Sequence, residues 1–223
     1  MKDFEDITWF GHASFSFQDK NGKRIYYVDP FDLKGLKFES ADLIFITHAH
    51  PDHFSQQDID KIITDKTHVI APPDILEKID IDESRKTAVA PNNSYIILDF
   101  KFSTIPAYNT HPDKLKFHPK ENNWVGYIFE LNNQKIYHAG DTDFIEEMKA
   151  LEKLSLDIAM LPIGGGYTMD FKEAADAANA IKAKITVPMH YRRLLAEKYP
   201  HIEDKFKKLV TDSKVVILPE AAL

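Results

Sequence analysis

Three histidines and one aspartate lie within six residues of a single loop: His48, His50, Asp52 and His53. Imidazole nitrogens and carboxylate oxygens are ligands that zinc and related divalent metals accept in proteins. Neither a packed core nor an ordinary solvated loop requires so many of them in so short a segment. The loop therefore predicts a metal site. Its four potential ligands exceed the three or so that one open catalytic site needs, so they could belong to two metal sites.

The elements around this loop must hold its ligands in place. The apolar residues 43–46 precede the loop directly and predict a buried strand that ends in it. Pro51 fixes one φ angle inside the loop and limits how the ligands can spread. The remaining ligands must come from other strand ends. The candidates are Asp29, His111, His118, His138, Asp141 and His190.

Size and composition indicate one globular domain. The chain has 223 residues, of which 43% are hydrophobic and 28% charged, so we expect a single domain spanning residues 1–223. The formal net charge of −7 argues against nucleic acid or an anionic membrane as a partner. A small-molecule substrate is the expected partner, and assembly into a homo-oligomer stays possible.

The absence of cysteine narrows the chemistry. With no cysteine in the chain, disulfides, thiolate metal sites and a cysteine nucleophile are excluded. The acidic first residues contain no apolar signal segment, and no apolar stretch is long enough to span a membrane. We therefore expect a cytoplasmic protein.

Strands alternate with helices in both parts of the chain. Ser55 is the expected N-cap of a helix that carries Ile59 and Ile62, and Asp170 is the expected cap of an alanine-rich helix. Residues 106–123 form an unusually long polar loop, which indicates a functional loop. Strands are expected at 7–10, 13–17, 24–28, 43–46, 68–71, 87–90, 95–98, 101–105, 124–131, 134–138, 156–161, 185–187 and 215–218. The order of hairpin, strand with ligand loop, and helix occurs twice, which predicts an α/β domain built from two similar halves.

Several motifs together resemble the metallo-β-lactamase-fold hydrolases, and within them the branch related to L-ascorbate-6-phosphate lactonase. The motifs extend over most of the chain. They are His-x-His-x-Asp-His at residues 48–53, Trp9-Phe10-Gly11-His12-Ala13-Ser14, Val28-Asp29-Pro30-Phe31, Tyr137-His138-Ala139-Gly140-Asp141-Thr142-Asp143 and Pro188-Met189-His190-Tyr191. The resemblance implies a four-layer αββα sandwich with two metal ions at one edge of the sheets.

The resemblance also implies a role for each ligand. His48, His50 and a mid-chain histidine would bind the first metal ion. Asp52, His53 and His190 would bind the second, with Asp141 bridging the two. Asp29 would orient the histidine loop instead of binding metal. The mid-chain ligand is His118 or His111, with His118 favoured because it precedes a Gly-Tyr strand, and His138 is expected not to be a ligand.

The expected chemistry is hydrolysis by a metal-activated water. Asp52 is the candidate to orient that water, and His12 and Tyr191 are candidates to stabilise an oxyanion. Tyr108 and Asn109, in the long loop, are candidates to line the substrate pocket. Two zinc ions are the expected cofactors, with manganese or iron as alternatives. The expected substrate is a small ester, lactone or phosphate-bearing metabolite.

Two other functions stay open. One is a phosphodiesterase or nuclease of the same fold, although the acidic balance and the lack of a basic arm count against RNA. The other is a metal-binding protein without catalysis. A diiron oxygen- or nitric-oxide-reducing centre is disfavoured, because it needs a glutamate where this chain has His50.

Overall fold

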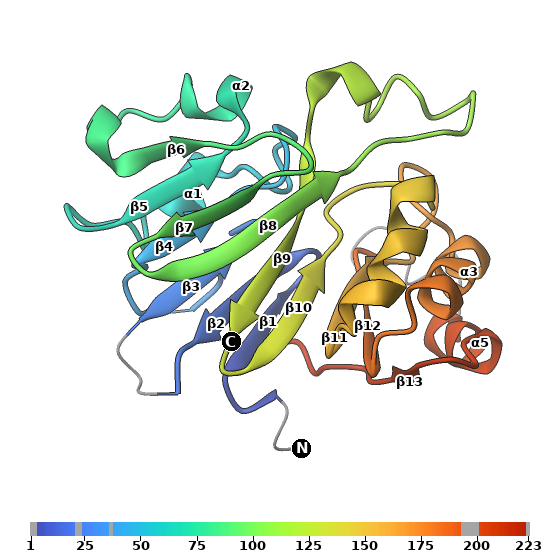
Figure 1. Cartoon of the computed structure of the whole chain (residues 1–223). Coiled ribbons are helices and arrows are strands. Elements are labelled where there is room, and N and C mark those ends of the chain that lie inside the picture. Colours follow the sequence, from blue (N-terminus) through green and yellow to red (C-terminus); the bar gives the residue numbers. More distant parts are fainter. Residues whose placement is uncertain (1–3, 21–23, 36–37, 193–200, 222–223) are drawn as a thin grey trace. The chain divides into compact units, whose positions relative to one another are not determined.

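The computed structural model describes residues 4–20, 24–35, 38–192 and 201–221. The chain forms two compact units, Met1–Val89 with Pro219–Leu223, and Ala90–Leu218. Each unit is built on one β-sheet (Figure 1). That both units make up one domain stays a prediction from the sequence.

The first unit contains a six-stranded sheet. Its strands follow chain order: β1 (Ile7–Gly11), β2 (Ser14–Gln18), β3 (Ile25–Val28), β4 (Leu43–Phe45), β5 (His68–Ala71) and β6 (Lys86–Ala88). β1, β2 and β3 are antiparallel, and β3 to β6 run parallel. The hairpin expected between β2 and β3 is confirmed by this pairing, while residues 21 and 22 of its turn lie outside the described residues.

Short helices cover one face of this sheet. The expected N-cap Ser55 is confirmed, since its side chain accepts a hydrogen bond from the Asp58 N–H at the start of α1 (Gln56–Ile59). α2 (Pro73–Leu76) packs on β5 and β6, and a short 3₁₀ helix, η2 (Glu83–Arg85), precedes β6. The helix at Ser55 is shorter than expected, since the structure places Ile62 in the turn that follows it. Both α1 and α2 contribute to a buried cluster with the sheet: Ile44, Ile46, Val69, Ala71, Ile59, Ile62, Ile75 and Ile79.

The second unit contains a seven-stranded sheet in the order β13-β12-β11-β10-β9-β8-β7. Its strands are β7 (Ser94–Ile97), β8 (Phe100–Pro106), β9 (Val125–Leu131), β10 (Gln134–His138), β11 (Ile158–Pro162), β12 (Ile185–Met189) and β13 (Lys214–Val215). β7 to β10 are antiparallel, and β10 to β13 are parallel. Asn132 and Asn133 both have positive φ angles, 53° and 63°, as a two-residue hairpin turn between β9 and β10 requires.

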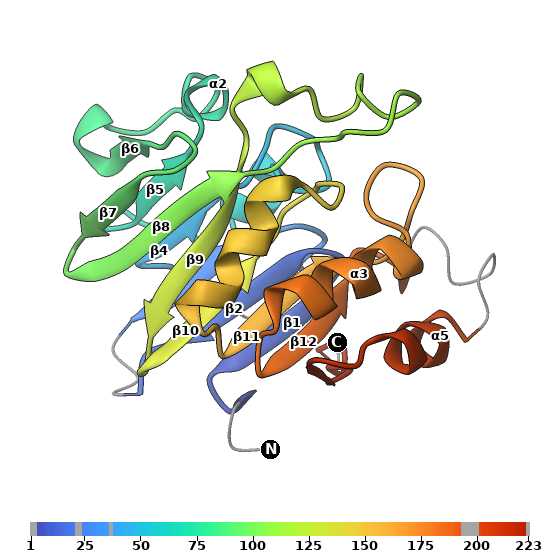
Figure 2. The same cartoon turned by 45° about the vertical axis from the view of Figure 1, so that its right-hand side comes forward.

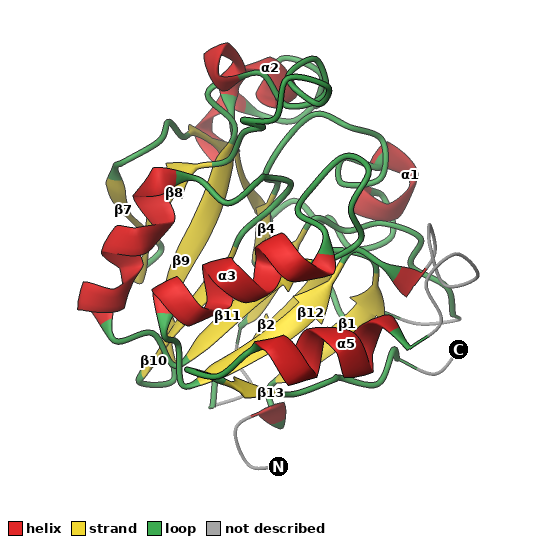
Figure 3. Cartoon of the chain, turned by 90° about the vertical axis from the view of Figure 1, so that its right-hand side faces the viewer, coloured by secondary structure: helices red, strands yellow, loops and turns green. Residues whose placement is uncertain are grey.

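Helix α3 (Phe171–Ile181) packs on β11, with α5 (Ile202–Leu209) and the 3₁₀ helix η4 (Glu146–Leu154) beside it (Figures 2 and 3). Four of its five alanines are buried: Ala174, Ala175, Ala177 and Ala178. The expected cap Asp170 accepts hydrogen bonds from the Lys172 and Glu173 N–H groups. No helix within the described ranges is long and apolar enough to cross a bilayer.

Strand ends place the predicted ligands. His48 follows β4 after two residues, Asp141 follows β10 after two residues, and His190 comes directly after β12. Because β10, β11 and β12 run parallel, Asp141 and His190 leave the second sheet at the same edge.

Gly126 in β9 allows the turn before Asp141 to pass close to the strand. A Cβ atom at this position would lie 2.9 Å from the carbonyl oxygens of both His138 and Ala139. We therefore expect Gly126→Ala to destabilise the fold by about 1–3 kcal/mol, because backbone atoms must move to accept the methyl group. Urea denaturation of the full chain measures this. Ser94→Ala, at an exposed position of β7, is the control and should change stability by less than about 0.5 kcal/mol. Equal unfolding midpoints for Gly126→Ala and the wild type would contradict the contact.

Candidate metal centre

Asp29 is the buried hydrogen-bond acceptor at the centre of the first unit's ligands. Its side chain is fully buried, and its Oδ1 accepts the Thr47 N–H at 2.8 Å. Its Oδ2 accepts the Thr47 hydroxyl at 2.7 Å and lies 2.8 Å from Nδ1 of His53. The expectation that Asp29 orients the loop agrees with these contacts.

These contacts determine which ring nitrogens carry hydrogen. An ionised carboxylate can only accept, so Nδ1 of His53 donates to Asp29 and the lone pair is on Nε2. The Thr47 hydroxyl uses its single hydrogen on Asp29, so it accepts from Nδ1 of His48 at 2.9 Å. His48 therefore also carries its lone pair on Nε2. One carboxylate thus prepares two histidines for metal binding.

His50 faces His48. Nδ1 of His50 lies 3.1 Å from Nε2 of His48, and the two rings meet edge to face. Two nitrogens bound to one tetrahedral zinc ion at about 2.0–2.1 Å lie about 3.3 Å apart. The spacing of this pair therefore fits two ligands of a single ion.

Asp52 and His12 form a second pair in the first unit. Nε2 of His12 lies 3.0 Å from Oδ2 of Asp52, and since the carboxylate can only accept, His12 donates. His12 is 2% exposed, and the Asp52 side chain is 36% exposed. Asp52 is thus the more accessible of the two, with one carboxylate oxygen held by the histidine.

Asp141 brings together the predicted ligands of the second unit. Its Oδ2 lies 3.1 Å from Nε2 of His190 and 3.4 Å from Nε2 of His118. All three side chains are nearly fully buried. Both distances exceed the 2.7–2.9 Å or so of a charge-assisted hydrogen bond and are close to the spacing of two ligands on one metal ion. These three residues therefore fit a divalent cation in both chemistry and spacing.

Three predicted site residues have strained backbones. Asp29, His12 and His190 have φ angles of 47°, 52° and 58°, in the left-handed region that residues with a side chain rarely adopt. Such conformations cost about 1–3 kcal/mol each and are concentrated at functional sites.

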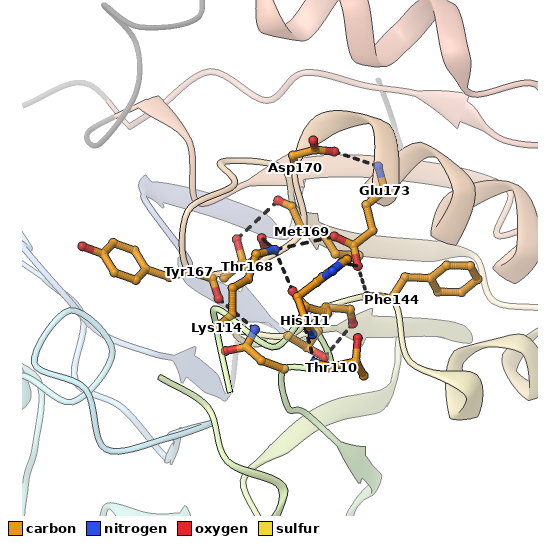
Figure 4. Close-up of polar contacts among 12 residues, drawn as sticks. Thr110, His111, Lys114, Phe144, Tyr167, Thr168, Met169, Asp170 and Glu173 are labelled. Atoms are coloured by element: carbon orange, nitrogen blue, oxygen red, sulfur yellow. Dashed lines mark hydrogen bonds and ion pairs between the residues drawn. The ribbon is translucent and has the colours of Figure 1, made fainter. Parts of the chain in front are cut away.

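His111 lies apart from Asp141 in a different cluster. Its side chain is 55% exposed, with Nε2 3.3 Å from Oε1 of Glu173. Lys114 lies in the same cluster, with its ammonium 2.9 Å from Asp143 and 3.7 Å from Glu173 (Figure 4). Because this ammonium already pairs with both carboxylates, the cluster fits an ion-pair network better than a metal site. That His118 and not His111 is the mid-chain ligand stays a prediction.

Other predicted side chains have structural contacts. The Tyr191 hydroxyl donates to Oε1 of Glu203 at 2.5 Å, so its hydrogen is directed at α5. Burial raises the pKa of Tyr191, and the hydrogen bond to Glu203 raises it further. Nδ1 of the buried His138 accepts the Gly140 N–H at 3.3 Å, which supports a role in shaping the turn before Asp141.

Comparisons with known proteins identify the family. The model of the β-lactamase superfamily domain matches residues 6–190. A protein of Thermococcus onnurineus named UPF0173 metal-dependent hydrolase is 36% identical over 224 residues, which cover 95% of each chain. The chain belongs to the UPF0173 family of metal-dependent hydrolases.

Solved structures agree with this assignment. A Parabacteroides distasonis protein described as a metal-dependent hydrolase is similar, with a TM-score of 0.82 and 30% identity, covering 95% of this chain and 91% of its own. A Thermotoga maritima protein described as a Zn-dependent hydrolase of the metallo-β-lactamase superfamily has the same fold, with a TM-score of 0.61, 23% identity and coverage of 95% and 96%. The UPF0173 chain is therefore an enzyme, and the predicted metallo-β-lactamase fold class is confirmed.

Sequence reasoning missed two residues that hold ligands. Thr47 relays the Asp29 contact to His48, and Asn109, which is predicted to line the pocket, contacts His118. A hydroxyl residue between a strand and a histidine loop is a weak signal for such a relay. Tyr108, the other predicted pocket residue, donates its hydroxyl hydrogen to Glu147 at 3.0 Å.

Replacing Asp29 should damage the metal site as well as the fold. An asparagine side chain at this position cannot accept from Thr47 twice and from His53, so Asp29→Asn should cost about 1–3 kcal/mol of stability. The altered His53 or His48 tautomer should weaken zinc binding about 10–100-fold. Zinc titration against a chelating dye, with urea denaturation in parallel, measures both quantities.

Asp58→Asn is the matched control. Asp58 is also a buried carboxylate, and it accepts hydrogen bonds from Asp32, Leu33 and Ser55. Its replacement should lower stability comparably and leave zinc affinity unchanged. Equal loss of affinity in both variants would show that Asp29 acts only through the stability of the fold.

Proposed function

We propose that this hydrolase is a single domain spanning residues 1–223. It would bind a pair of divalent metal ions, which we expect to be zinc. The proposed metal ligands are His48, His50, Asp52, His53, His118, Asp141 and His190. The observation that carries this proposal is the position of a buried oxygen acceptor beside Nδ1 of three histidines. Buried acceptors hold Nδ1–H of His48, His53 and His118, so that all three histidines present Nε2 lone pairs.

Bound divalent ions would lower the pKa of a coordinated water to about 7 and would polarise the scissile oxygen of the substrate. Asp52 would orient the attacking water and take up its proton. His12, which donates to Oδ2 of Asp52, would fix the position of that carboxylate. Tyr191 could stabilise an oxyanion only after its hydroxyl leaves Glu203.

The proposed substrate is a small ester, lactone or phosphate-bearing metabolite, as the motif resemblance to L-ascorbate-6-phosphate lactonase implies. The net charge of −7 disfavours a polyanionic substrate such as RNA. A phosphodiesterase of the same fold is the alternative that the same site could support.

The two mid-chain histidines give a direct test of the ligand assignment. His118→Ala should lose zinc from the site, because it removes a buried nitrogen 3.4 Å from Asp141. His111→Ala should bind zinc as the wild type does, since His111 is exposed and pairs with Glu173. Metal content per chain, measured by plasma mass spectrometry after dialysis, distinguishes the two. Zinc loss in His111→Ala with retention in His118→Ala would reverse the assignment.

A substrate screen tests the reaction class. The zinc-loaded full chain should hydrolyse members of a panel of lactones, esters and phosphate monoesters, and a chelator should abolish turnover. His50→Ala should reduce turnover to background, with little effect on folding because His50 is only partly buried. Turnover restricted to phosphodiesters or RNA would favour the alternative. Tight zinc binding without turnover on any of these panels would make the protein a metal-binding protein without hydrolysis.

A further inference from the structure

We propose that Asn109 is a positioning residue for His118, because it fixes which ring nitrogen of that histidine carries hydrogen. This inference rests on the proposed function, in which His118 binds metal. Asn109 lies shortly after β8 and His118 lies nine residues later in the same long loop, and both side chains are buried.

The orientation of the Asn109 amide is determined by two backbone groups. Its Oδ1 accepts the backbone N–H of His118 at 3.1 Å, and its Nδ2 donates to the carbonyl oxygen of Tyr167 at 2.9 Å. A backbone N–H can only donate and a carbonyl can only accept, so a flipped amide would lose both contacts. Oδ1 therefore faces His118.

The same oxygen determines the tautomer of His118. Nδ1 of His118 lies 2.8 Å from Oδ1 of Asn109. Since an amide oxygen can only accept, Nδ1 carries hydrogen, and in the neutral ring Nε2 carries the lone pair. Nε2 is the atom that lies 3.4 Å from Oδ2 of Asp141. Asn109 thus holds His118 through the backbone N–H and through the ring Nδ1–H of that histidine. This contact orients Nε2 of His118 toward the Asp141 carboxylate.

Further contacts hold the segment that follows Asn109. The N–H groups of Thr110 and His111 both donate to Oδ2 of Asp143, at 2.8 Å and 3.1 Å. The Lys114 ammonium donates to Oδ1 of Asp143 at 2.9 Å and to the Thr168 carbonyl at 2.8 Å.

Figure 4 shows this network between the long loop, the turn at Tyr167 and Thr168, and the start of α3. Thr168 follows Tyr167, whose carbonyl accepts from Asn109. The Asn109 side-chain amide is therefore held on one side by its own loop and on the other by the turn at Tyr167. The network provides a rigid support, so that the Asn109 oxygen has a defined position before a metal ion binds.

Nitrogen-15 NMR of the metal-free full chain reads the tautomer directly. Long-range proton–nitrogen correlation spectra distinguish a protonated ring nitrogen from one that carries a lone pair. The wild type should show His118 with hydrogen on Nδ1 and a lone pair on Nε2. Hydrogen on Nε2 without hydrogen on Nδ1 would overturn the inference whatever the metal affinity is.

Two variants of Asn109 separate tautomer control from packing. Asn109→Leu removes the acceptor, so His118 should lose its preference for the Nδ1–H form and zinc affinity should fall about 10–100-fold. Asn109→Asp retains an acceptor for both His118 contacts but cannot donate to Tyr167. It should therefore be destabilised and yet keep the tautomer and near-wild-type affinity for Zn²⁺. Co²⁺ absorption spectra should likewise change in Asn109→Leu and stay the same in Asn109→Asp.

Asn179→Leu is the matched control. Asn179 has the same pattern of contacts, since its Nδ2 donates to the Leu209 carbonyl and its Oδ1 accepts the Thr211 N–H. This variant should bind Zn²⁺ as the wild type does. Wild-type affinity and tautomer in Asn109→Leu would overturn the inference. A wild type with the expected tautomer but no Zn²⁺ binding would instead overturn the proposed function and leave the role of Asn109 in place.

Discussion

The metal centre depends on buried oxygen atoms that accept hydrogen bonds from the Nδ1–H groups of its histidines. An imidazole has two nitrogens, and a neutral ring binds metal only through the one that carries a lone pair. A buried oxygen acceptor beside Nδ1 makes that choice in advance, since a lone pair on Nδ1 would face the lone pairs of the oxygen and be repelled. In a buried site a mismatch also leaves a polar group without its hydrogen bond, at about 1–3 kcal/mol. The acceptors therefore set both the geometry and the stability of the ligands.

The two units achieve this in chemically different ways. In the first, Asp29 acts on His53 directly and on His48 through Thr47, so one negative charge supports two ligands. In the second, the neutral amide of Asn109 acts on His118, and the negative charge lies on Asp141. An amide avoids a further buried carboxylate close to Asp141, where like charges would repel each other. In both arrangements the nitrogens that would bind metal are in position before a metal ion binds.

The sequence predicted most of the fold because the hydrophobic pattern determines strands directly. β5 and β10 have the expected bounds, and β8 extends one residue beyond them at each end. α5 was missed, since its lysines and acidic residues obscure the buried Ile202 and Phe206. The histidine loop could be identified because four residues of metal-ligand type lie within six positions. The supporting residues could not be found in this way, because Thr47 and Asn109 acquire their roles from contacts that no spacing rule describes.

Crystallography of the zinc-loaded full chain, with diffraction recorded at the zinc absorption edge, tests the central claim most directly. The account predicts zinc bound through Nε2 of His48, His53 and His118, with Nδ1 of each ring still on its oxygen acceptor. It also predicts coordination by His50 through Nδ1, the atom that faces His48. Zinc bound through Nδ1 of His48, His53 or His118, or anomalous density remote from these histidines, would contradict the account.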